Sequence, residues 1–131
     1  MKTFLIIFFI FLGTNLHAEI VYLKCEIKNL NDSSSFTKSI KINGSKFTVI
    51  GDAFLVNKDI NITEEQYSIR NQYKGVYSIS KEPFISVTTI DINRYTGSYQ
   101  EIHHDYKNGS QSPTDTLEFN GNCRKVTEKL F

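Results

Sequence analysis

Residues 84–106 read FISVTTIDINRYTGSYQEIHHDY, and this stretch decides the fold class of the whole chain. Its first half is rich in β-branched and aromatic residues, which fit a pleated, half-buried surface. Gly97 separates this half from a second extended run, and glycine takes a positive φ angle without a steric penalty. The stretch therefore predicts a β-hairpin with Gly97 at its corner, in the last position of a three-residue loop.

Shorter runs of the same kind surround this hairpin. In 20–28 the apolar and polar residues alternate, which is the period of a half-buried strand. The Asn43-Gly44 pair lies between two further alternating runs and is typical of a type I′ hairpin turn, with Gly44 at positive φ. Residues 58–80 also favour strands, although the sequence TEEQ at 63–66 is compatible with a capping box that opens a short helix.

Together these runs predict an all-β, antiparallel domain of about eight short strands. We expect a single meander that forms a closed or partly closed barrel, with a β-sandwich as the alternative. No internal repeat, low-complexity tract or domain boundary interrupts the chain of 131 residues. Its length is sufficient for one domain with a hydrophobic core of its own.

The first 18 residues match a secretory signal peptide. Lys2 provides the positive charge, 4–12 is an unbroken apolar run, and Ala18 is a small residue at the expected cleavage site. Cleavage between Ala18 and Glu19 would leave one β domain over 19–131 in the periplasm or outside the cell. The apolar run is shorter than the roughly 20 residues that span a bilayer, so we expect no stable membrane span after cleavage. An uncleaved N-terminal anchor is the alternative.

Two cysteines, Cys25 and Cys123, lie near opposite ends of the chain. In an exported protein an even number of cysteines predicts a disulfide. Each cysteine shares its strand parity with apolar residues, so both sulfur atoms are expected to face the core. A bond between them requires the first and last strands to be neighbours in the sheet, as they are in a meander that closes.

The charge balance argues against nucleic acid as a partner. Lys2 is the only charged residue of the signal segment, so cleavage would leave 14 basic and 14 acidic residues. A chain without net charge has no sequence-independent attraction for phosphates.

The most chemically reactive stretch of the sequence is the one around the two histidines of the mature chain. In a strand Glu101, His103 and Asp105 share one face and His104 lies on the other, so the adjacent histidines cannot chelate one metal ion together. We interpret the shared face as solvated, beside a sheet edge, with a weak adventitious metal site as the alternative. The sequence thus predicts no catalytic, cofactor-binding or metal-binding residue.

The pattern NRYTG at 93–97, followed by GNC at 121–123 and the ending KLF at 129–131, resembles a type of small exported bacterial protein of uncharacterised function. These proteins carry an Arg-x-Ser/Thr-Gly turn late in the sequence and Gly-x-Cys near the end. The resemblance covers about the last third of the chain. It implies export from a bacterium and a β fold, and it implies no activity.

Three functions fit these observations. The first is a binding module for a small apolar or amphipathic ligand or for a protein partner, because an eight-stranded barrel holds at most one small ligand. The second is an envelope accessory or structural protein whose barrel is filled by side chains. The third, which has the least support, is a hydrolase. The tyrosines in the second half of the chain have two interpretations, an aromatic-lined binding face and ordinary sheet packing. These tyrosines are Tyr67, Tyr73, Tyr77, Tyr95, Tyr99 and Tyr106.

Overall fold

A computed structural model describes residues 19–127, which form a single antiparallel β-sheet and no helix. The predicted signal segment 1–18, with Ala18 at its cleavage site, lies outside the described residues. The all-β prediction is confirmed. The strands are β1 (Ile20–Asn29), β2 (Ser35–Asn43), β3 (Lys46–Val49), β4 (Lys58–Asp59), β5 (Asn61–Ile62), β6 (Gln66–Val76), β7 (Pro83–Asn93), β8 (Ser98–Lys107) and β9 (Asp115–Val126).

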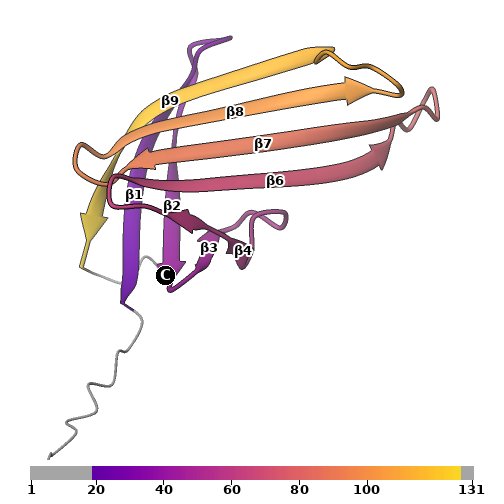
Figure 1. The fold of residues 1–131 in the computed structure, drawn as a ribbon. Helices are drawn as coiled ribbons and strands as arrows, with labels where there is room; N and C mark the ends of the chain where they lie inside the picture. The colour runs from indigo at the N-terminus through magenta and orange to yellow at the C-terminus, as the bar shows by residue number, and fades with distance from the viewer. Residues whose placement is uncertain (1–18, 128–131) are drawn as a thin grey trace, which may run out of the picture.

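The order of the strands shows that the sheet curls into a nearly closed barrel. That order is β4-β3-β2-β1-β9-β8-β7-β6-β5, so the first and last strands pair in the middle of the sheet. The two edge strands, β4 and β5, are separated in the chain by Ile60 alone, and β4 packs against β6. In Figure 1, β1 and β2 cross β6, β7 and β8 at a steep angle, and the long strands β6 to β9 extend well past them. The predicted meander and partly closed barrel are therefore confirmed, and the sandwich alternative is not adopted.

The junction between β1 and β9 carries the predicted disulfide. Cys25 and Cys123 are direct partners in the register of the two strands, and their Cα atoms lie 4.0 Å apart. Close by, β9 bends away from β8 to follow β1 (Figure 1). Gly121 is needed there, because a Cβ atom at this position would lie 2.1 Å from the carbonyl oxygen of Glu26. A glycine in a strand interior often marks such a close approach of two backbones.

The hydrophobic core lies between β1, β2 and β3 on one side of the barrel and β6, β7 and the start of β8 on the other. Alternate residues of β1 are buried as the sequence predicts. Residues 53–56, which the periodicity leaves unassigned, add Leu55 to the core from the loop after β3, and the Leu55 carbonyl accepts a 2.8 Å hydrogen bond from the N–H of Val49. The cluster consists of Val21, Leu23, Cys25, Ile27, Ile40, Ile42, Phe47, Val49, Leu55, Ile60, Tyr67, Ile69, Ile90, Ile92 and Tyr99.

The central hairpin has Gly97 at its corner with φ 75°, but its loop is one residue longer than predicted. Four residues, 94–97, connect β7 to β8. The reason is the side chain of Asn93, whose Oδ1 accepts hydrogen bonds of 2.9 Å from the N–H groups of both Tyr95 and Thr96. These bonds hold the first loop residues in a turn, and the glycine then closes the loop in the left-handed region.

The other turns form near the sequence signals, but the turn after β2 differs from the prediction. Gly44 has φ 57°, yet the two turn residues are Gly44 and Ser45, because Asn43 ends β2 and pairs with Lys46. Neither Asn43 nor Ser45 has a positive φ, so the turn is not of the predicted type I′. At 63–66 the structure has a hairpin turn between β5 and β6, so the preference for strands over a helix is confirmed. The Thr63 hydroxyl does accept a 3.0 Å bond from the N–H of Gln66, as in a helix cap, but here it stabilises the turn.

We expect Cys25→Ser to lower the free energy of unfolding sharply. The two cysteines are 98 residues apart, and for a loop of about this length the chain-entropy model gives roughly 4.7 kcal/mol as an upper figure. Urea unfolding of Cys25→Ser, Cys123→Ser and the double variant measures the loss. All three variants should lose the same free energy of unfolding, since each lacks the same bond. A urea midpoint of the wild type that does not respond to reductant would contradict the prediction.

We also expect Gly97→Val to destabilise the protein more than Gly75→Val. A Cβ atom on Gly97 would lie 2.1 Å from the backbone carbonyl oxygen of Cys123, and its φ of 75° is strained for valine. The nearest atom to a Cβ on Gly75 is 2.7 Å away in the ring of Phe84, a side chain that can move. Thermal melts compare the two variants, and equal losses would show that the Gly97 corner is not a constrained position.

Candidate functional site

The inner face of β6, β7 and β8 changes from apolar to polar along the strands. Near the core, Ile69 of β6 faces Ile90 of β7 across the ladder. Further along the same face the side chains carry hydroxyl, amide, imidazole and carboxylate groups. Two cross-strand rows contain them, Asn71–Thr88–His103 and Tyr73–Ser86–Asp105. Because strand register sets these rows, polar groups from three strands meet on the concave side of the sheet.

Glu101 lies at the boundary between the apolar and polar regions and is only 1% exposed. Lys38 binds it from β2, with distances of 2.7 and 3.0 Å from Nζ to the two carboxylate oxygens. Nε2 of His103 lies 2.5 Å from Oε1, and the hydroxyl of Tyr99 donates a hydrogen bond to Oε2. Since β1 and β9 separate β2 from β8 in the sheet, the Lys38–Glu101 ion pair crosses the interior of the barrel.

This arrangement corrects the interpretation of Glu101, His103 and Asp105 as a solvated face beside an edge. The three side chains do share a face, but it is the inner one, where Glu101 is buried and the other two are half-buried. The physical reason is the curl of the sheet, which encloses this face, together with Lys38, which supplies the positive charge that a buried carboxylate requires.

The network fixes the ionisation of Glu101 and Tyr99. Burial by itself would raise the pKa of Glu101, but the hydrogen bond from His103 and the positive charge of Lys38 outweigh it and bring the pKa to about 2. Burial, followed by the charge of Glu101, raises the pKa of Tyr99 far above its ordinary value. The carboxylate is therefore ionised and the phenol neutral throughout the physiological pH range.

His103 is held in one orientation by contacts on both ring nitrogens. An ionised carboxylate only accepts hydrogen bonds, so Nε2 donates to Glu101, while Nδ1 lies 2.9 Å from the hydroxyl oxygen of Thr88. The ring also packs edge-on against Phe119, with centroids 5.5 Å apart. Thr88, His103 and Glu101 are connected in the order of the nucleophile, base and carboxylate of a catalytic triad. The charge of the Glu101 carboxylate is already paired with Lys38, however, so less of it is left to stabilise an imidazolium.

A cleft of about 290 Å³, the inner cleft, opens beside this network. Part of its lining is aromatic: the rings of Phe54 and Tyr73 lie 5.3 Å apart, and those of Tyr73 and Phe84 lie 6.0 Å apart. Most of the remaining lining is polar and comes from the other members of the two rows. The complete lining is Asp52, Phe54, Leu55, Asn71, Tyr73, Phe84, Ser86, Thr88, His103 and Asp105. Apolar walls with a few convergent polar groups are typical of small-molecule sites, and this volume is at the lower end of their range.

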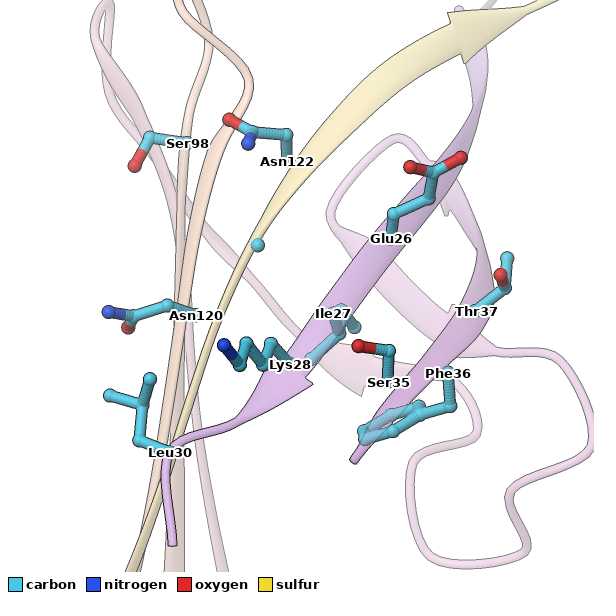
Figure 2. Close-up of a pocket in the computed structure, with 11 residues that line it drawn as sticks. Glu26, Ile27, Lys28, Leu30, Ser35, Phe36, Thr37, Ser98, Asn120 and Asn122 are labelled. Atoms are coloured by element: carbon cyan, nitrogen blue, oxygen red, sulfur yellow. The ribbon is translucent and has the colours of Figure 1, made fainter. Parts of the chain in front are cut away.

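A second hollow, the outer hollow, is larger, at about 690 Å³, and lies near the junction of β1 and β9. Figure 2 shows its side chains, such as Glu26 and Lys28 of β1 and Asn120 and Asn122 of β9, spread along the strands without converging on one point. Because these side chains do not converge, they offer a small molecule few polar contacts at one point, so the inner cleft is the better candidate for chemistry.

Sequence reasoning missed most of the inner cleft. It assigned no role to Lys38, Thr88 or Ser86, and it could not place the segment that carries Phe54. Of the six tyrosines considered as an aromatic face, only Tyr73 lines the cleft. One signal was available in 84–92. The residues that share the inward face of this strand are serine and threonine at 86 and 88 and isoleucine at 90 and 92.

The described residues show no other feature that would assign a function. Among residues 19–127, no group of three histidine, cysteine, aspartate or glutamate side chains is placed to hold a metal ion. In the same range no helix has the length and apolar character needed to cross a membrane. Comparisons with protein-family models, with curated proteins and with solved structures each find no match for this chain.

We expect part of the protein's stability to be lost in acid through Glu101. Its pKa is depressed from 4.5 to about 2 in the folded state, so its contribution is complete above about pH 4.5 and disappears as the pH falls through 2. The amount is on the order of 3 kcal/mol. Urea unfolding between pH 6 and 2 should show this loss in the wild type and in Glu118→Gln, which changes an exposed carboxylate. Glu101→Gln should lack it, and an identical pH dependence in all three proteins would contradict the assignment.

Proposed function

We propose that this chain is a small exported binding protein that holds one small amphipathic molecule in the inner cleft. The single observation that carries the proposal is the composition of the cleft, whose lining combines three aromatic rings with polar side chains from the two rows. An amphipathic ligand would place its apolar body against Phe54 and Tyr73 and its polar end against His103 and Asp105. The two polar rows belong to paired strands, so they are positioned before any ligand arrives.

Export is part of the proposal. The Cys25–Cys123 bond fits an oxidising compartment, and the first 18 residues have the order of charge, apolar run and small residue of a signal peptide. The resemblance of the last third of the chain to small exported bacterial proteins supports the same location, in the periplasm or outside the cell.

An envelope accessory protein that acts through its surface is the second candidate. The outer hollow favours it, because the hollow is wide and partly apolar, with Leu30 48% and Phe36 37% exposed at its rim. Such a protein would have no need of a small molecule, so the ligand experiment below separates the two candidates.

We expect the purified protein to bind tryptophol, a small molecule with a planar apolar ring and one polar end, in the inner cleft. Phe54→Ala should weaken binding about two- to tenfold, because an aromatic contact contributes about 0.5–1.5 kcal/mol. Isothermal calorimetry measures the affinity, and Tyr95→Ala is the matched control, since Tyr95 is an exposed aromatic residue outside the cleft. No binding by the wild type, or equal weakening in the two variants, would count against the inner cleft as the ligand site.

A further inference from the structure

We propose that the inner cleft selects ligands with a positively charged amine and that Asp105 is the residue that binds this amine. The inference rests on the proposed function and specifies its ligand class. It starts from the charges of the cleft: two carboxylates, Asp52 and Asp105, line it, and no lysine or arginine does. Lys38, the half-buried cation inside the barrel that pairs with Glu101, is therefore already neutralised.

Asp105 is the carboxylate with free hydrogen-bonding capacity. Oδ1 of Asp52 already accepts the N–H groups of Phe54 and Leu55, at 2.8 and 3.3 Å. Asp105 is half-buried, and within residues 19–127 no hydrogen bond or ion pair reaches its carboxylate; Thr114 donates only to its backbone carbonyl. A half-buried carboxylate without a partner is a favourable site for a ligand that donates hydrogen bonds and carries a positive charge.

The neighbours of Asp105 increase the negative potential there. Asp115 of β9 is its direct partner across the ladder, and like charges at facing positions of an antiparallel pair are destabilising. His103, on the same face, has both ring nitrogens occupied by Glu101 and Thr88. Lys107, two residues further along β8, is exposed, lines a different hollow and forms no ion pair with Asp105. A bound cation would therefore relieve the repulsion between the two carboxylates.

The aromatic part of the inner cleft lining accommodates the rest of such a ligand. The rings of Phe54, Tyr73 and Phe84 provide an apolar surface for its body, while Asp105 binds its amine. The volume of about 290 Å³ limits that body to a small one, such as a single fused ring system. The ligand class is therefore a small aromatic or apolar amine.

Three indole derivatives with the same ring and different polar ends test this inference: tryptamine, tryptophol and indole-3-propionate. We expect the wild type to bind tryptamine roughly tenfold more tightly than neutral tryptophol, and the anionic propionate most weakly. Asp105→Asn should reduce tryptamine to the affinity of tryptophol and leave tryptophol unchanged. Asp91→Asn, on the outer face of β7, is the matched control and should keep the preference.

The outcomes separate this inference from the proposed function. If the wild type binds the three compounds equally, selection for an amine is overturned and the binding function stands. If it binds none of them, both are overturned. The wild-type ranking needs no variant, so the test holds even if Asp105→Asn does not fold. A preference for tryptamine that persists in Asp105→Asn would assign the amine to another residue and overturn the role of Asp105.

Discussion

The barrel depends on the pairing of its first strand with its last. β1 and β9 are joined along their register and by the Cys25–Cys123 bond, and β9 bends beside Gly121 so that it can pair with β8 and with β1. Without this junction the chain would form two small sheets, β1 to β4 and β5 to β9, with no strand pairing between them and Ile60 as their link in the chain. A covalent bond at this place restricts the unfolded chain strongly, because it closes a long loop between cysteines that are 98 residues apart.

The ion pair between Lys38 and Glu101 is the second connection between the two arms of the sheet, and it has a different role. Burying two charges costs solvation energy that their attraction only partly recovers, so such a pair is a weak source of stability. The ion pair instead sets the position of side chains. It lies between the apolar core and the polar rows, and Glu101 holds the ring of His103 in the lining of the inner cleft.

The inner cleft exists because the two arms differ in length. β6 to β9 extend past β1 to β3, and the ends of these strands lack a facing sheet (Figure 1). The loop that follows β3 covers part of this region with Leu55 and Phe54. The core could be predicted from residue alternation, since every second residue of β1 is buried. The cleft could not, because Phe54 lies in a segment without periodicity and reaches the cleft only after the barrel has closed.

The sequence by itself determined the local features: the strands, from their period of two; the hairpin corners at Gly44 and Gly97, from backbone sterics; and the one disulfide, from the count of cysteines. Each of these depends on neighbouring residues or on a covalent bond. The tertiary structure alone decided which face of β8 is interior, and with it the role of Glu101. Its partner Lys38 is 63 residues away in the chain, and their contact depends on how the sheet curls, which no local pattern contains.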